Sequence, residues 1–285
     1  MKLVRGLQRG VAVIRELTRA QACTLAELNT ATKLPKATLL RLLRTLEMEG
    51  IVWRSLGDGA YRYRGGALVG TKHDRQRLAE CSGPHLAELQ KTVLWPSDLA
   101  VRRGSFMELV ETSRGLASLS LSRDRLGKRL DFAASAIGRA YLAFCPAPER
   151  ERIIDYIAAH PESRVALGPV DRVELKRALE EARRNGFATR DPSLVNGLWR
   201  LDLEDDHLDA IAVPIVGGTR IIGCLNVVWL RHLRLKDTII KNHLADLQDA
   251  AAAIAATMRA ALTRRERGRR GYGGGKPMLG MEAGK

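Results

Sequence analysis

The stretch KLPKATLLRLLRTLEMEG, residues 33–50, decides how this chain is interpreted because it is apolar on one side and basic on the other. Its leucines recur at the spacing of one buried helical face, at Leu39, Leu42, Leu43 and Leu46. The opposite face carries Ala37, Thr38, Arg41, Arg44 and Thr45. Such a face suits either plain solvent exposure or a binding surface. The flanking sequence must decide between these two interpretations of the face.

Two shorter helices are predicted before this stretch. Residues 7–18 place apolar side chains at helical spacing. Thr24 and Glu27 have the spacing of a capping box, in which each side chain accepts a hydrogen bond from the other residue's backbone amide. A second helix therefore begins there and ends near residues 30–33. Pro35 suits the first turn of the third helix, which stops at Gly50.

After Gly50 the period changes from helix to strand. Residues 51–54 and 60–64 are predicted to be short strands, joined by a loop that contains the frequent turn pair Asp58-Gly59. Three helices followed by a basic hairpin describe a winged helix-turn-helix, here assigned to residues 1–66. In such a domain the third helix enters the major groove of DNA.

The basic side chains of this domain are the candidate DNA contacts. On the third helix, Arg41 and Arg44 suit base edges or phosphates, and Thr38 suits a phosphate or a thymine methyl. Lys33 and Lys36 near the helix start suit phosphate positioning. The hairpin adds basic residues that either contact the adjacent backbone or minor groove or form an ordinary polar strand face, namely Arg54, Arg62 and Arg64.

The positive charge is concentrated at the two ends of the chain. Of the net +15, residues 1–75 carry 14 basic and 6 acidic side chains, whereas residues 76–262 carry 26 and 24. Residues 263–285 carry 7 and 2 and are rich in glycine, so we expect a disordered basic tail. Such a tail either adds salt-dependent affinity for DNA or only solvates the chain end. This distribution favours a polyanionic partner for the N-terminal domain.

Cysteine spacing and hydropathy exclude several other classes. The chain has four cysteines without a CxxC pair or a histidine at ligand spacing, so we expect neither a zinc site, another cofactor nor a disulfide framework. No signal peptide and no apolar run of about 20 residues is present, which predicts a cytoplasmic protein. Cys145 and His85 share no catalytic motif, so we expect no enzyme. The competing interpretation is a non-specific, architectural nucleic-acid-binding protein.

The middle of the chain predicts an α+β domain over residues 92–262. A helical connector, residues 67–91, is expected to break near Gly83-Pro84. Strand-like runs surround residues 102–104, and helices are expected from Ser135, over residues 148–160, and over residues 171–185 with a cap at Asn185-Gly186. Residues 208–230 predict two buried strands joined at Gly217-Gly218, and a last helix is expected over 237–262.

With this order in place, the sequence resembles the IclR family of bacterial transcription regulators over roughly residues 4–262. LAELNTATKLPKATLLRLLRTLEMEGIV is similar to the family's helix-turn-helix, and SAIGRAYLAF with IAVPI and IIGCLNVV is similar to its effector-domain signature. The resemblance implies a GAF-like effector domain and a homodimer, or dimer of dimers, on a pseudo-palindromic operator. VLWPSD, GRAYLAFCP and IIGCLNVVW are similar to the branch that controls 3-(3-hydroxyphenyl)propionate breakdown, and this resemblance implies a small organic acid effector of the aromatic class.

The same resemblance places an effector pocket in this domain. Carried over by position, it falls on Ala136, Ile137, Leu208, Ala210, Asn226 and Val228. The first two have amides at a helix N-terminus, which suits a carboxylate. Trp95 either stacks on an aromatic ligand or is plain core, and Asn226 either bonds the ligand or satisfies a backbone group. Ala210 and Val228 replace the cysteine and hydroxyl residues of other members, and residues 198–209 are shortened, so we expect a less polar pocket.

Overall fold

The computed structural model describes residues 4–49, 51–63, 71–117, 126–161, 170–191 and 207–272. The first of these segments and the second form the winged helix. Its helices are α1 (Arg5–Ala20), α2 (Leu25–Thr32) and α3 (Lys36–Met48), and its hairpin pairs β1 (Val52–Arg54) with β2 (Tyr61–Tyr63). The capping box at Thr24 and Glu27 is present. The predicted winged helix-turn-helix is therefore confirmed.

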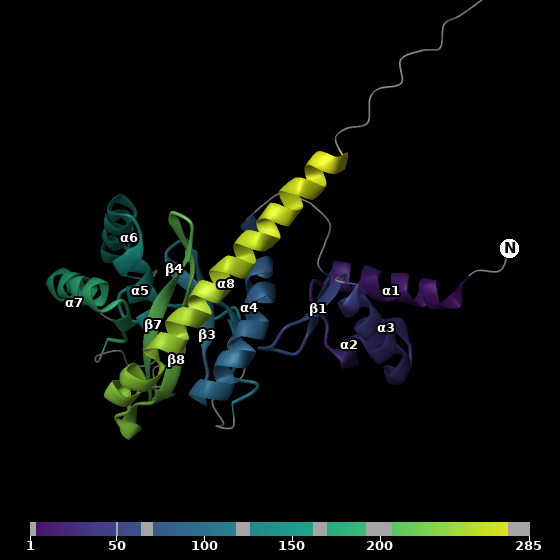
Figure 1. The fold of residues 1–285 in the computed structure, drawn as a ribbon, viewed down its shortest axis with the longest axis horizontal. Helices are drawn as coiled ribbons and strands as arrows, with labels where there is room; N and C mark the ends of the chain where they lie inside the picture. Colours follow the sequence, from purple (N-terminus) through teal and green to yellow (C-terminus); the bar gives the residue numbers. More distant parts are fainter. Residues whose placement is uncertain are drawn as a thin grey trace, which may run out of the picture.

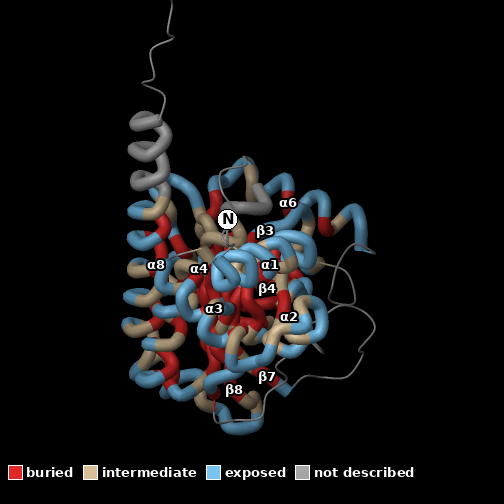
Figure 2. Tube along the Cα trace, turned by 90° about the vertical axis from the view of Figure 1, so that its right-hand side faces the viewer, coloured by how far each residue is buried: buried red, intermediate tan, exposed pale blue. Residues whose placement is uncertain are grey.

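The small core of the winged helix explains which face of α3 is exposed. Leu39, Leu43 and Leu46 are buried against residues of α1, α2 and the hairpin. Because these leucines follow the helical period, they fix the rotation of α3 about its axis and turn its basic side outward. Among the described residues of the chain, the buried ones concentrate in the sheet and on the sides of the helices that pack against it (Figure 2).

The second domain is built on a six-stranded antiparallel sheet. Its strand order is β5-β4-β3-β8-β7-β6. The strands are β3 (Asp98–Arg103), β4 (Phe106–Thr112), β5 (Arg129–Leu130), β6 (Ala188–Thr189), β7 (Leu208–Gly217) and β8 (Arg220–Leu230). The long β7–β8 pair turns at Gly217 and Gly218, as the sequence predicts.

Helices cover both faces of this sheet (Figure 1). One face, called here the effector face, packs against α5 (Ala136–Phe144), α6 (Ala147–Ala159) and α7 (Arg172–Asn185). The opposite face packs against α4 (Thr71–Val93) and α8 (Lys236–Tyr272), which also contact each other. The winged helix lies beyond α4. The α+β fold class with an N-terminal DNA-binding fold is thus as expected.

Two expectations about helices are wrong. The connector helix α4 is not broken at Gly83-Pro84 but continues through Pro84 to Val93. Burial of Leu78, Leu86 and Leu89 along one side of α4 outweighs the helix-breaking tendency of the proline. The tail predicted to be disordered from residue 263 is helical to Tyr272, where arginine and glutamate favour a helix; residues 273–285 lie outside the described part of the chain.

Candidate functional site

The exposed face of α3 is the candidate DNA-binding surface. Lys36, Arg41 and Arg44 are exposed on it, Thr38 is half-buried, and Lys33 is exposed at the C-cap of α2, in a left-handed conformation with φ of 55°. None of these four cations forms an ion pair with another described residue. Their charge is therefore available to an external anion.

The two described arginines of the hairpin form their polar contacts with other residues of the hairpin. Arg62 forms a two-point ion pair with Asp58, with its closest N–O distance at 2.5 Å, and its guanidinium lies 5.4 Å from the centre of the Trp53 ring. Arg54 is exposed and donates from Nε to the Gly59 carbonyl at 2.9 Å. Arg54 thus forms no ion pair with a described carboxylate, whereas Asp58 offsets the charge of Arg62. Arg64 lies outside the described residues.

The turn of this hairpin is bonded to the second domain, which the sequence did not reveal. Gly57 N donates to Glu111 Oε1 at 2.7 Å, and Ser55 Oγ donates to the same carboxylate at 3.1 Å. Glu111 lies on β4 and is fully buried. Burial raises the pKa of Glu111, although hydrogen bonds from Thr112, Gly57 and Ser55 act in the opposite direction. Among the described residues, the winged helix is therefore bonded to this carboxylate as well as to α4, where Gln76 Nε2 donates to the Tyr63 carbonyl at 3.0 Å.

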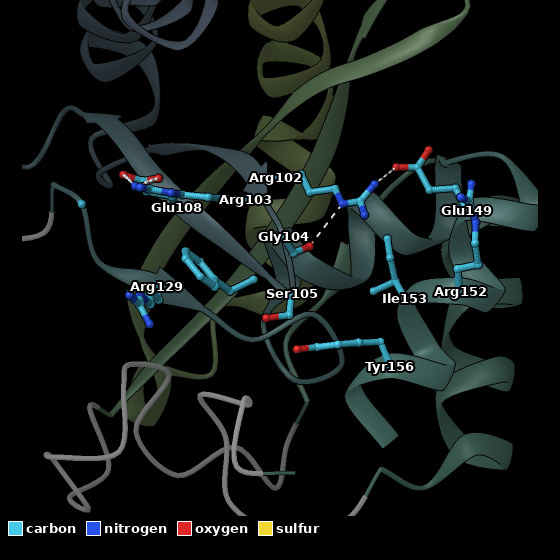
Figure 3. Close-up of a pocket in the computed structure, with 12 residues that line it drawn as sticks. Arg102, Arg103, Gly104, Ser105, Glu108, Arg129, Glu149, Arg152, Ile153 and Tyr156 are labelled. Carbon is cyan, nitrogen blue, oxygen red and sulfur yellow. Dashed lines mark hydrogen bonds and ion pairs between the residues drawn. The ribbon is translucent and has the colours of Figure 1, made fainter. Parts of the chain in front are cut away.

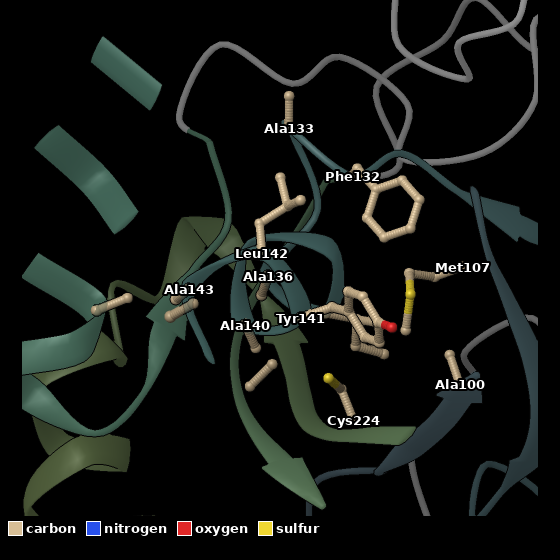
Figure 4. Close-up of a cluster of buried hydrophobic side chains, with 14 of the residues drawn as sticks. Ala100, Met107, Phe132, Ala133, Ala136, Ala140, Tyr141, Leu142, Ala143 and Cys224 are labelled. Carbon is tan, nitrogen blue, oxygen red and sulfur yellow. The ribbon is translucent and has the colours of Figure 1, made fainter. Parts of the chain in front are cut away.

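The structure gathers the predicted effector residues on one face of the sheet, with one exception. Five of them belong to a single buried cluster on the effector face, namely Ala136, Ile137, Leu208, Ala210 and Val228. Figure 4 shows this cluster around Ala136, with Phe132, Tyr141 and Cys224 among its other members. Asn226 pairs with Ala212 of the same cluster and so shares that face. Trp95 packs instead against the cluster beneath α4 and α8.

The N-terminus of α5 is held rigidly at this face. Ser135 Oγ accepts a hydrogen bond from Gly138 N at 3.0 Å, and Asp131 Oδ1 accepts from the amides of Ala133 and Ala134. A Cβ atom on Gly138 would lie 2.3 Å from the Asp131 carbonyl oxygen. Only glycine therefore allows α5 to approach the preceding segment this closely.

Two buried arginines border the effector face. Arg139 of α5 forms an ion pair with Asp191, and burial lowers its pKa. Arg190 donates from Nη1 to the Leu208 carbonyl at 3.0 Å. Sequence reasoning missed both, although Arg139 was visible as a charged residue inside the apolar run AIGRAYLAF. Asp191 offsets the charge of Arg139, whereas Arg190 places a second buried guanidinium beside Leu208, one of the predicted effector residues.

A separate cationic cavity of about 780 Å³ lies beside the β3–β4 hairpin and α6 (Figure 3). Arg102 pairs with Glu149 and Arg103 with Glu108, and the Arg129 guanidinium lies 4.5 Å from the centre of the Phe106 ring. Arg152 and Tyr156 of α6 complete the lining. None of the predicted effector residues lines this cavity, in which Glu149 and Glu108 offset the charges of Arg102 and Arg103.

Cys145 and His85, the thiol and imidazole considered for catalysis, lie on opposite sides of the sheet. Cys145 belongs to the cluster on the effector face, where burial raises its pKa to about 11. His85 lies on α4, on the other side of the sheet, with Nε2 2.9 Å from Thr257 Oγ of α8. The described part of the chain holds no group of His, Cys, Asp or Glu suited to a metal ion. Nor does it hold a helix long and apolar enough to span a bilayer.

A winged helix with an exposed basic helix, attached to a separate α+β domain, defines a class of DNA-binding transcription regulators. Comparison with known families agrees with this class. The IclR helix-turn-helix domain matches residues 6–55, and the description "Bacterial transcriptional regulator IclR C-terminal" matches residues 71–256. The chain belongs to the IclR family of bacterial transcriptional regulators.

Individual relatives agree with this assignment. The HTH-type transcriptional regulator XynR of Escherichia coli is 26% identical over 271 residues, which cover 89% of this chain and 97% of XynR. The transcriptional repressor IclR of the same organism is 25% identical, covering 75% of this chain and 80% of the repressor. The crystal structure of Thermotoga maritima IclR has the same fold, with a TM-score of 0.52 at 19% identity over 88% of this chain and 98% of that one. XynR and the Escherichia coli repressor are both named as transcription regulators.

Proposed function

We propose that this regulator binds one operator sequence-specifically, as a homodimer or dimer of dimers, and controls the catabolism of an aromatic or other small organic acid. Residues 1–66 serve as the DNA-binding domain and residues 92–262 as the effector and oligomerisation domain. The observation that carries the proposal is the exposed face of α3, where Arg41 and Arg44 form no ion pair with described residues. An arginine in the major groove bonds guanine bidentately.

An exposed apolar stripe on α1 supports a dimer. Val4, Leu7 and Val11 occur at helical spacing and are 67%, 68% and 38% exposed, although they are large and apolar. Contact with α1 of a second copy would bury this stripe. A two-fold axis there presents two copies of α3 to two half-sites of a pseudo-palindromic operator.

The composition of the effector face supports a small organic acid as the effector. Its predicted lining is apolar apart from Asn226, which suits the body of such a molecule. The N-terminus of α5, together with Arg190, suits its carboxylate. The aromatic class rests on the resemblance to the branch that handles 3-(3-hydroxyphenyl)propionate.

The test is a gel-shift titration of the full chain with DNA from its own upstream intergenic region in excess unlabelled random DNA. It is run without ligand, with 3-(3-hydroxyphenyl)propionate and with related aromatic acids. A retained shift that the acid alters supports both operator and effector. A shift that random DNA removes indicates the non-specific, architectural binder instead.

Two variants locate the acid. Arg190→Ala should weaken the response if the acid occupies the effector face, whereas Arg152→Ala should weaken it if the acid occupies the cationic cavity. The second result would move the effector site away from the predicted residues.

A further inference from the structure

Buried hydrogen bonds run without interruption from the effector face to the DNA-binding hairpin. They start at Asn226 on β8, whose Oδ1 accepts from the Asp98 amide of β3 at 2.7 Å. Asp98 Oδ1 in turn accepts from Thr112 Oγ of β4 at 2.6 Å. Arg114 fixes Asp98 through two bonds of 2.9 and 2.8 Å. This part of the chain of hydrogen bonds lies on the effector face.

A β-bulge between β3 and β4 places the next two residues of this chain of hydrogen bonds on opposite faces of the sheet. The register between β3 and β4 shifts so that Ala100 opposes Leu109 and Leu99 opposes Glu111. Thr112 then shares a face with Asp98, while Glu111 shares the opposite face with Leu99. Thr112 N donates to Glu111 Oε1 at 3.0 Å, so two adjacent residues link the two faces.

The connection ends at the hairpin turn, where the Gly57 backbone lies close to Glu111 and Thr112. Glu111 accepts from Gly57 N and Ser55 Oγ. A Cβ atom added to Gly57 would lie 2.8 Å from both Glu111 Oε1 and Thr112 Cγ2. The side chains of Asn226, Asp98, Thr112, Glu111 and Ser55 belong to residues that are at most 6% exposed. Little water reaches these groups to replace a hydrogen bond that breaks. A displacement of Asn226 therefore either moves the next residue of the connection or leaves a buried polar group without a hydrogen bond.

We propose that Thr112 and Glu111 are positioning residues that transmit the state of the effector face to the DNA-binding hairpin. The inference deepens the proposed function and rests on it for the identity of the two ends. It gives the hairpin a route to the ligand domain that bypasses the connector helix α4. A ligand that displaces β8 at Asn226 would then alter the hold of β4 on the hairpin turn.

The first test needs neither operator nor ligand. Amide hydrogen exchange of Gly57 is measured in the full chain for wild type, Asn226→Leu, Glu111→Gln and the double variant. Each single variant should speed Gly57 exchange by about twofold or more, and the double variant should equal Glu111→Gln because both act through one connection. Glu88→Gln, which touches only an exposed ion pair on α4, is the control and should change nothing. No effect of Asn226→Leu, or additive effects, would overturn the relay.

The second test uses the regulatory response and a conservative rescue. Thr112→Val keeps the shape of Thr112 but removes its hydroxyl, whereas Thr112→Ser restores the hydroxyl. An effector typically changes DNA affinity by about 5–150-fold, and Thr112→Val should reduce this to below about twofold while operator and 3-(3-hydroxyphenyl)propionate each still bind. A full response in Thr112→Val, or its loss in Thr112→Ser, contradicts the proposal. If the wild type binds no operator, the proposed function fails, and the exchange test still decides the relay.

Discussion

Replacing both Arg41 and Arg44 with alanine should remove operator discrimination and leave the fold intact. Both side chains are exposed and form no ion pair with described residues, so the free energy of unfolding should change by less than about 0.5 kcal/mol. A bidentate arginine–guanine pair is worth about 1–3 kcal/mol of discrimination, which gives about 2–6 kcal/mol for two such pairs. The operator affinity should therefore fall about 30-fold even at the lower end of this range.

The assay is a fluorescence anisotropy titration of the operator fragment and of a scrambled fragment at several salt concentrations. A matched control is the double variant Arg177→Ala/Arg184→Ala on α7, which removes the same charge from exposed positions of the other domain. This control should retain the ratio of operator to scrambled affinity. Unchanged operator affinity in the α3 variant, or an equal loss on both fragments, would refute the assignment of α3 as the recognition helix.

Three further predictions concern stability. Thr24→Ala removes the hydroxyl half of the capping box of α2 and should lower the free energy of unfolding by about 1 kcal/mol in urea titrations; an unchanged midpoint would contradict the cap's role. Gly138→Ala places a Cβ atom 2.3 Å from the Asp131 carbonyl and should cost about 1–3 kcal/mol or more by calorimetry, whereas Gly83→Ala meets open space and should not. Burial raises the pKa of Glu111 above its ordinary value of 4.5, so the native state binds a proton at Glu111 more tightly than the unfolded state does. The resulting stabilisation is fully present below pH 4.5 and is lost as the pH rises through the native pKa. The stability of Glu111→Gln should therefore fall less steeply above pH 4.5 than that of wild type, and parallel profiles would speak against a raised pKa.

The winged helix could be predicted in detail because its signals are local. The capping box lies within four consecutive residues, and the leucine period of α3 fixes its exposed side without reference to any other domain. Helix α4 shows the limit of such signals. Pro84 is unfavourable inside a helix, yet α4 continues because Leu78, Leu86 and Leu89 pack on partners distant in sequence. Local preference decides only where tertiary packing does not oppose it.

The candidate effector site was predictable to the extent that strand alternation governs it. Ala210 and Val228 are directly opposed on β7 and β8, so their positions in two predicted strands already imply a shared face. Trp95 precedes β3 in an irregular segment, where no period fixes the direction of its side chain. The structure places the Trp95 side chain against the cluster beneath α4 and α8, apart from the other predicted effector residues.

The buried carboxylate of Glu111 shows why the connection between the domains could be predicted only in part from the sequence. In FMELVET the apolar alternation breaks at Leu109-Val110, which marks the bulge that turns Glu111 to the opposite face. The partner of Glu111, however, is a glycine amide 54 residues earlier, and a backbone donor leaves no pattern in a sequence. A glutamate on β4 would ordinarily be assigned to solvent, because an unpaired buried carboxylate is unfavourable. Its burial is tolerated because three groups donate to it, and two of them, Gly57 N and Ser55 Oγ, belong to the hairpin turn. The position of the DNA-binding fold and the stability of this carboxylate therefore depend on each other.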